Sequence, residues 1–494
     1  TYSQDSSSTY NVEVNNSGLS DKIVVIGTAT LAGTLAVQAQ PGKYQRTSTY
    51  TILTATGGVS GNFSTLTSNM ASLTSTVVVA GNTVTLVLLN SAAILPGSDT
   101  NSYTANQGTI ANILNQAGTT LSGGDLNTVL NTLSNLTPAQ LAPILDSLSG
   151  QNYSGFSSVA MQGTQLFMNS FQVQAGGGGG GGGGGASLPG GSTYQALKVD
   201  TADACESACD VEPLWGAWGG GLGAFGTVAG DSNSHGLTYN LGGFIAGLDR
   251  KFAPGFRVGI ATGFNAASLY TQGTPGTGTS NTLQFALYGE YAPGPFYLDG
   301  LAGYGHSDNR MNRPIIIPGL PFRMAQGYTT ANTFFGQLEA GYKIPVVPSF
   351  GGFVTPFARL QASTSTQAGF SETGADSLDL TVAQQTTNSL RTVLGAQLGA
   401  SADAPWHEKL DLTLRLGWSH EYADTNRPVT AAFAGAPALS FTTFGAQAPR
   451  DGVVLGLGAN TQVAEHTSVY LRYDGDLAGA NTNHVLNAGI RYVW

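Results

Sequence analysis

The sequence predicts an all-β-dominated chain: a twelve-stranded antiparallel transmembrane β-barrel with a helix in its lumen, preceded by the C-terminal rungs of a β-solenoid. Three observations predict the barrel and its helix. Lys and Arg number 19 and Asp and Glu 29 in 494 residues, whereas glycine alone numbers 69. The second half alternates apolar with polar residues over long stretches. An uncharged stretch with helical periodicity precedes that half.

The composition excludes several classes of protein. A disordered chain or a coiled coil needs far more charge than this one has. No stretch approaches the ~20 continuous apolar residues of a membrane-spanning helix. A net charge of −10 argues against nucleic acid as a partner. The chain opens at Thr1 without Met or a signal segment, so we expect a mature product or a fragment of a longer protein.

Changes in composition divide the chain into four segments. Ten consecutive glycines, Gly176–Gly185, cannot offset their backbone entropy by burying side chains, so they predict a flexible tether. The predicted segments are a β junction, a helical linker, the glycine-rich tether and the barrel, at residues 1–96, 97–175, 176–210 and 211–494.

The junction shows short β-branched runs separated by turn residues. Ala80-Gly81-Asn82 separates two of them and predicts a hairpin. Small and apolar residues at short, regular steps in 21–37 suit successive coils of a β-solenoid. A small β-sandwich explains this stretch equally well.

The linker has helical periodicity. Leu126, Val129, Leu130 and Leu133 are spaced for one helix, and Thr137 followed by Pro138 predicts the start of another. A third helix is expected over about 153–174. It is uncharged and too polar to face lipid, and a helix of ~20 residues is ~30 Å long, about the thickness of a bilayer core.

Alternation in the second half fits two architectures. In Leu410–Ser419, Leu residues and Trp418 line one face while Asp411, Thr413 and Arg415 line the other. Such a strand suits a soluble sandwich or an outer-membrane barrel. Strand length favours the barrel, because soluble strands average five or six residues and spanning strands need about 9 to 11.

Twelve strands are predicted in this half. They lie near 213–228, 237–252, 256–271, 279–294, 295–311, 329–346, 353–373, 388–403, 409–423, 451–464, 467–478 and 483–494. Short links such as 253–255 alternate with long ones such as 311–328 and 374–387. Short turns are periplasmic in such barrels, so both barrel ends are expected in the periplasm. A twelve-stranded bore has intermediate width, and the uncharged helix would roughly fill it.

The alternation places a set of charged side chains in the lumen. They form either a conduction or docking surface, or a paired network that stiffens the wall. The predicted lumen-facing residues are Arg257, Glu290, Glu339, Arg359, Arg391, Arg415, Arg472 and Arg491.

The chain resembles the monomeric autotransporters, the type V secretion proteins. Tyr50–Phe63 is similar to the segment that closes their β-helical passenger, and Leu148–Tyr153 to their linker motif. Trp215–Trp218, Gly247–Arg250, Arg427–Arg450 and the terminal Arg491–Trp494 are similar to parts of their twelve-stranded translocator. The ten-glycine tract is a departure from the family's pattern.

The resemblance implies a bacterial outer-membrane protein with residues 1–96 at the cell surface. It implies as partners the outer-membrane lipid, the barrel-assembly machinery, periplasmic chaperones and the chain's own passenger domain, which passes through or beside the barrel. The assembly machinery would read an insertion signal on the last strand: Leu486, Ala488, Ile490, Tyr492 and Trp494.

Other candidate chemistry is weaker. Gly230-Asp-Ser232 is similar to a hydrolase nucleophile motif, but it falls in an external loop and none of the six histidines has an Asp three residues before it. We therefore expect no enzyme and no cofactor. Cys205 and Cys209 predict a local disulfide in an oxidising periplasm. A metal site would need more ligands than their acidic neighbours supply.

The predicted function is therefore export and anchoring of an N-terminal passenger whose own activity the residues do not reveal. A surface adhesin or self-association protein is an alternative favoured by the Ser/Thr/Asn-rich start, and a diffusion porin is another. A surface enzyme with its catalytic part upstream of Thr1 is a third.

Overall fold

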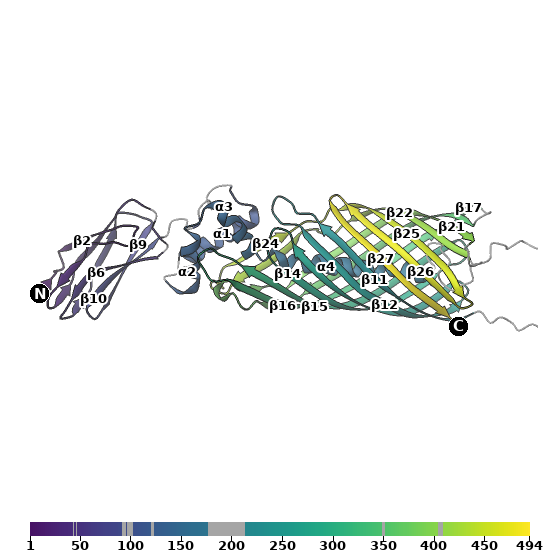
Figure 1. The fold of residues 1–494 in the computed structure, drawn as a ribbon, viewed down its shortest axis with the longest axis horizontal. Helices are drawn as coiled ribbons and strands as arrows, with labels where there is room; N and C mark the ends of the chain where they lie inside the picture. The colour runs from purple at the N-terminus through teal and green to yellow at the C-terminus, as the bar shows by residue number, and fades with distance from the viewer. Residues whose placement is uncertain are drawn as a thin grey trace, which may run out of the picture.

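The computed structural model describes residues 1–494 except positions 43, 46, 91–94, 96–101, 120–122, 176–212, 348–350 and 404–408. A short-stranded β unit, a cluster of helices and a long barrel follow one another along the molecule (Figure 1). The predicted tether, with Cys205 and Cys209, lies outside the described residues. The segment boundaries predicted from composition therefore stay predictions at that point.

The N-terminal unit is a β-solenoid. Its strands stack in parallel on three faces, one strand per face in each coil; Tyr2 pairs with Ala29, and Ala29 in turn with Val59. The faces are β1 (Tyr2–Ser3), β4 (Ala29–Leu31) and β7 (Val59–Gly61); β2 (Thr9–Val14), β5 (Thr34–Ala39) and β8 (Thr65–Ser68); β3 (Ile23–Val25) and β6 (Thr47–Ala55). This parallel stacking decides against the β-sandwich, whose sheets are antiparallel.

An antiparallel hairpin ends the solenoid. It consists of β9 (Leu73–Ala80) and β10 (Thr83–Asn90), and β10 lies between β6 and β9 in the sheet. The turn predicted at Ala80-Gly81-Asn82 is present, and Gly81 adopts a φ of 56°, a conformation that a side chain would strain.

Four α-helices follow among the described residues: α1 (Ala105–Gly118), α2 (Gly124–Leu133), α3 (Pro138–Leu148) and α4 (Ser154–Ala175), with a 3-10 turn, η1 (Gln151–Tyr153), before α4. Thr137 caps α3 by accepting from the Gln140 backbone N–H, and Pro138 is the first helical residue. Leu126, Val129, Leu130 and Leu133 are all buried along α2. The helical periodicity in the sequence is thus confirmed.

The described part of the second half closes into a twelve-stranded antiparallel barrel. Its strands are β11 (Trp215–Val228), β12 (Leu237–Ala253), β13 (Phe256–Thr271), β14 (Thr277–Tyr291), β15 (Phe296–Ile315), β16 (Arg323–Tyr342), β18 (Gly352–Gln367), β21 (Gln385–Asp403), β22 (Lys409–Glu421), β25 (Asp451–Ala464), β26 (Thr467–Ala478) and β27 (Asn481–Val493). Pairing of β11 with β27 closes the ring. A short strand, β17 (Ile344–Val347), pairs with the start of β18.

The predicted strand bounds need correction at the outer end. The link expected over 311–328 shrinks, because β15 and β16 stay paired to Ile315 and Arg323. The expected strand 353–373 ends earlier, because β18 stops at Gln367. The end of that predicted strand and two expected loops supply a four-stranded sheet of β19 (Phe370–Ser371), β20 (Leu380–Val382), β23 (Arg427–Phe433) and β24 (Ser440–Gly445). Buried and exposed positions still alternate along β23 and β24, because one face of these strands packs on the helices instead of facing lipid. The helices α1, α2 and α3 lie at this end, and the barrel termini lie at the other (Figure 1).

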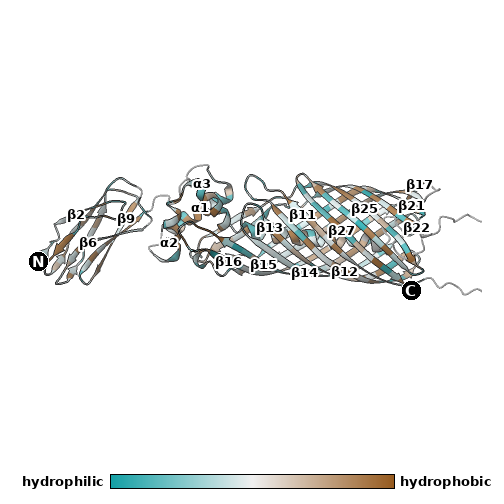
Figure 2. Cartoon of the chain, viewed as in Figure 1, coloured by the Kyte–Doolittle hydropathy of each residue, from teal (hydrophilic) through white to brown (hydrophobic). Residues whose placement is uncertain are grey.

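The barrel exterior is apolar. Side chains of Phe, Leu and Ile recur on the outward positions of its strands, so apolar residues alternate with polar ones in Figure 2. Tyr291, Tyr342, Trp418 and Trp494 point outward near strand ends, each about half exposed. An apolar band with aromatic borders is the surface that a bilayer requires. No helix in the described segments is both long and apolar enough to cross a membrane.

Candidate functional site

The pore of the barrel holds α4. This helix lies along the lumen (Figure 1), and it contacts strands on several sides of the wall, among them β12–β16, β18 and β27. Its first turn lies at the outer end, where Ser154 packs against Gly445 of β24. Its last turns reach the opposite end of the barrel, because the Phe171 ring lies 5.6 Å from the ring of Trp218, near the start of β11. The expected lumen helix is therefore present.

Glycines bring α4 close to one side of the wall. A Cβ atom on Gly155 would lie 3.1 Å from Leu269 Cδ1, and one on Gly163 would lie 3.4 Å from Leu241 Cδ1. The wall makes room in return, since a Cβ on Gly263 would meet the Phe167 ring at 2.7 Å. These small residues seat the helix against β12 and β13.

An aromatic cluster surrounds the inner end of α4. Phe171 lies 5.0 Å from the Tyr288 ring, and Phe167 lies 5.6 Å from the Phe335 ring. Trp218 Nε1 donates to the Tyr288 hydroxyl at 2.7 Å. Buried rings in such edge-to-face contacts add packing energy beyond the area they bury. The lumen is thus filled by side chains at this level.

Three of the predicted lumen residues form one charged group that holds α4. Glu339 lies 2.6 Å from both Arg359 and Arg415, and all three side chains are buried. Arg359 Nη1 donates to Asn169 Oδ1 of α4 at 2.7 Å, and Tyr297 donates to Glu339 at 2.8 Å. A buried carboxylate with two guanidinium partners has the pairing that burial of charge demands.

Three more predicted residues gather at the seam where the last strand meets the first. Arg491 of β27 makes two bonds to Asp249 of β12, at 2.8 and 2.6 Å. It reaches across Gly216 of β11, where a Cβ atom would lie 2.3 Å from the guanidinium. Arg257 lies 3.4 Å from Asp249 and 3.6 Å from Glu290.

The remaining two predicted residues are paired separately. Arg391 donates to Asp476 at 2.5 Å and Arg472 to Asp474 at 2.6 Å. Arg391 also lines a cavity of about 130 Å³ between α4 and the wall, bounded by Gln162 among others. All eight predicted residues thus lie on the inner face, and the pairing favours the stiffening network over a free conduction surface. The prediction missed Asp249, although it lies in the quoted motif Gly247–Arg250 and follows the same alternation.

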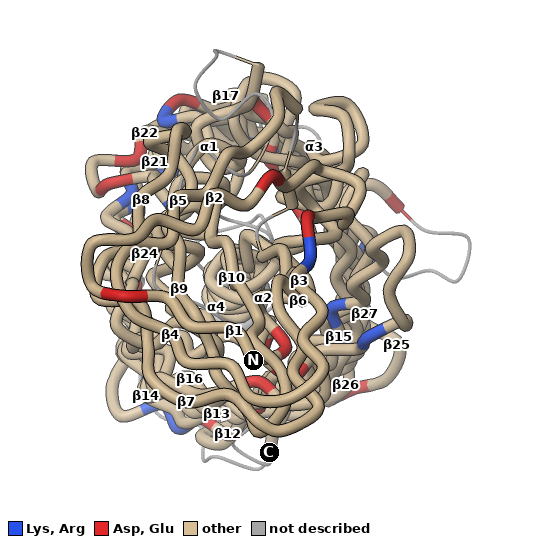
Figure 3. Tube along the Cα trace, turned by 90° about the vertical axis from the view of Figure 1, so that its left-hand side faces the viewer, with Lys and Arg blue, Asp and Glu red and all other residues tan. Residues whose placement is uncertain are grey.

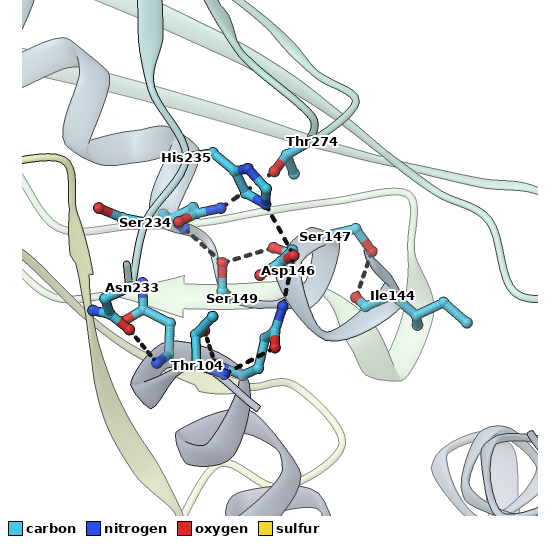
Figure 4. Close-up of polar contacts among 12 residues, drawn as sticks. Thr104, Ile144, Asp146, Ser147, Ser149, Asn233, Ser234, His235 and Thr274 are labelled. Atoms are coloured by element: carbon cyan, nitrogen blue, oxygen red, sulfur yellow. Dashed lines mark hydrogen bonds and ion pairs between the residues drawn. The ribbon is translucent and has the colours of Figure 1, made fainter. Parts of the chain in front are cut away.

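A polar cluster lies at the outer mouth (Figure 4). Asp146 of α3 accepts from Gln107 Nε2 of α1 at 2.9 Å and lies 2.9 Å from His235 Nε2 of the first external loop. Asn106 of α1 donates to the Phe444 carbonyl of β24 at 2.7 Å. Two helices, a barrel loop and a loop strand are thereby joined at one point.

A buried ion pair lies below this cluster. Arg313 of β15 donates from Nε and Nη2 to the two carboxylate oxygens of Glu372, and both side chains are fully buried. Arg313 also donates to the Ser147 carbonyl at 2.7 Å, and Tyr153 donates to Glu372 at 2.7 Å. Neither charged residue was predicted as part of a site. Arg313 falls in the expected link 311–328, and Glu372 falls at the end of the expected strand 353–373, beyond Gln367, where β18 ends.

A second contact holds α2 to the barrel's outer end. Both Arg323 nitrogens donate to Asp125, at 2.7 and 2.6 Å. Hydrogen bonds from Arg323 and Ser377 lower the pKa of Asp125 to about 2. Asp125 is therefore ionised at any physiological pH.

The hydrolase-like triplet is an ordered turn. Asp231 Oδ1 accepts from the N–H groups of Asn233 and Ser234, and Ser232 is exposed. The nearby His235 is directed at Asp146 instead. Within the described ranges, no group of three or more His, Cys, Asp or Glu residues is placed to hold a metal ion.

The last strand presents the predicted insertion signal outward. Leu486, Ile490, Tyr492 and Trp494 are each about half exposed, and Ala488 shares their face. Asn487 and Arg491, between them, are buried inside. The five residues form one apolar stripe on the lipid side; its reading by the assembly machinery stays a prediction.

A closed barrel with an apolar exterior, a paired charged interior and a helix seated in its pore defines an outer-membrane translocator. The comparison with known families agrees: residues 217–474, more than half of the chain, match the model described as the autotransporter beta-domain. The chain belongs to this autotransporter family and lies in the bacterial outer membrane.

The chain is similar to three further proteins. The extracellular serine protease of Serratia marcescens is 24% identical over 522 residues, which cover 99% of this chain and 48% of that protein. Outer membrane protein A of Rickettsia rickettsii is 29% identical over 163 residues, 31% of this chain and 7% of that protein. The translocator domain of the autotransporter NalP from Neisseria meningitidis shares 16% identity with a TM-score of 0.49, covering 70% of this chain and 99% of that structure. The chain thus spans about half the length of the first relative.

Proposed function

We propose that this protein exports the chain N-terminal to α4 through its own barrel and then holds it at the cell surface. One observation carries the proposal: the polypeptide runs from the solenoid, through the mouth helices, and down the pore as α4. Residues 1–96 then lie outside the cell, and α4 remains as the plug.

Protease treatment of intact cells tests this topology. We expect cleavage of residues 1–96 on whole cells, while the barrel stays intact. Protection of the solenoid on whole cells, with cleavage only after the outer membrane is permeabilised, would contradict the proposal.

A diffusion porin is the competing function, and the occupied lumen disfavours it. We expect low conductance in planar bilayers from the intact protein, and a several-fold rise after deletion of 154–175. Gly108→Leu on α1 is a matched control, because nothing lies within 4 Å of a Cβ at that position. High conductance from the intact protein would favour the porin.

The partners follow from this proposal. The apolar band would meet outer-membrane lipid, and the stripe on the last strand would be recognised by the barrel-assembly machinery after periplasmic chaperones deliver the chain. We further propose that residues 1–494 carry no enzymatic activity, since the hydrolase-like Ser232 lies in a turn whose histidine is paired elsewhere. The serine protease activity named for the Serratia relative would, if shared, reside in a segment upstream.

A further inference from the structure

The solenoid ends in an open sheet edge. In the order β3-β6-β10-β9, β9 has β10 on one side and no other described strand on the other. The other two faces hold three strands each, so the face with β9 extends one strand further than they do. Alternate N–H and C=O groups of an edge strand point outward and are ready to pair with another strand.

This end of the solenoid has no charge. From Thr47 to Ser98 the sequence holds no Lys, Arg, Asp, Glu or His. Viewed along the molecule from the solenoid end, coloured charged positions are few among its strands (Figure 3). β9 itself, Leu-Thr-Ser-Thr-Val-Val-Val-Ala, is β-branched and has neither Pro nor Gly. Natural edges are usually protected by such charges or by Pro, and this one is not.

The same end leaves part of its core uncovered. Phe63, Leu66, Met70, Val77 and Val79 pack against the solenoid core but stay partly exposed. In the preceding coil, by contrast, Leu35 and Val37 are fully buried. A partner that adds a strand to β9 would therefore also cover apolar side chains.

We propose that β9 pairs antiparallel with β9 of a second copy of this chain on a facing cell. The proposal rests on the surface location of residues 1–96 given above. Two copies of this uncharged strand can pair side by side, since no like charges oppose each other. Antiparallel pairing extends the sheet β3-β6-β10-β9 without a break.

The direction of β9 decides whether the paired copy lies on the same cell or on a facing one. Thr47, at the start of β6, bonds to Asn127 and Asn131 of α2, so this end of the sheet faces the barrel. Thr74 of β9 lies at the same end, because Leu89 pairs with both Thr47 and Thr74. β9 thus runs away from the membrane, and an antiparallel copy has its barrel on the opposite side.

Charge substitutions on β9 test the pairing on cells that display the full chain. Thr76 and Val78 point outward and are exposed. In Thr76→Lys/Val78→Lys, like charges would face each other across the joint about 5 Å apart. We expect settling of cells into clumps to weaken about tenfold or more.

The matched control is Thr85→Lys/Val87→Lys. These residues lie directly opposite Val78 and Thr76 on the same face, but on β10, which has strands on both sides. Between two copies they would be about three strand spacings apart, beyond the ~8 Å screening length. This variant should clump like the parent.

A mixing experiment separates pairing from misfolding. Cells with Thr76→Lys/Val78→Lys and cells with Thr76→Glu/Val78→Glu should each settle poorly alone and clump when mixed. Undiminished clumping of either variant alone, or no recovery on mixing while whole-cell proteolysis still releases the solenoid, would overturn the pairing. If the solenoid is protected from protease in the parent cells, the surface location fails instead, and the pairing on facing cells fails with it.

Discussion

Gly216 is the residue on which the seam between the first and last strands depends. Arg491 crosses it to reach Asp249, and a Cβ atom there would overlap the guanidinium. We expect Gly216→Val to break this buried pair and to lower the free energy of unfolding by about 3 kcal/mol. Urea titration of the barrel in lipid vesicles, followed by its heat-modifiable gel mobility, measures the loss.

Gly221→Val on the same strand is the control for strand propensity. Its Cβ would meet nothing within 4 Å, so the substitution adds a β-branched residue without displacing a partner. Equal destabilisation by both variants would show that the seam pair contributes little.

At the scale of elements, the first turn of α2 meets the barrel's outer end through the Asp125–Arg323 ion pair and through Leu126, which packs against Gly435. The folded pKa of Asp125, about 2, lies below its unfolded value near 3.9, so the stabilisation is complete above that unfolded value and is lost as pH falls through the folded one. We expect this ion pair to be lost, and the first turn of α2 to loosen from the barrel, between about pH 4 and 2. A fluorophore on Thr128→Cys, in a Cys205→Ser/Cys209→Ser chain, reports the movement.

Arg323→Gln provides the comparison for this titration. Without the guanidinium, the main cause of the depressed pKa is gone, so most of the change should shift upward toward pH 4. The same midpoint in both proteins would mean that another group governs the contact.

Elements with a strict period were predictable from the sequence, and contacts between distant segments were not. Leu410–Ser419 alternates because one face meets lipid, and this alone located β22. Arg313 and Glu372 carry no such pattern, since their burial depends on contacts with each other, with α3 and with Tyr153. The pairing partners of the lumen charges likewise follow from barrel register, which alternation does not specify. The choice between solenoid and sandwich needed the parallel pairing itself.

At the scale of the whole molecule, the outward-facing residues together determine how deep the barrel lies in the bilayer. Leu360 and Thr366 lie on the outward face of β18, six residues apart, with Thr366 toward the mouth. That separation is about 20 Å along the strand, or about 15 Å of depth at a strand tilt of ~40°, which is more than half the height of the ~25 Å apolar band. An arginine on this face should therefore cost more at one position than at the other.

We expect Leu360→Arg to destabilise the barrel by about 2–4 kcal/mol and Thr366→Arg by about 0–1 kcal/mol, since the penalty falls from the midplane to the interface. Folding equilibria in lipid vesicles measure both. The two variants share strand, face and charge, so their difference reports depth alone. Similar penalties at both positions would place the midplane of the apolar band between them, and the reverse order would place it near Thr366, closer to the mouth.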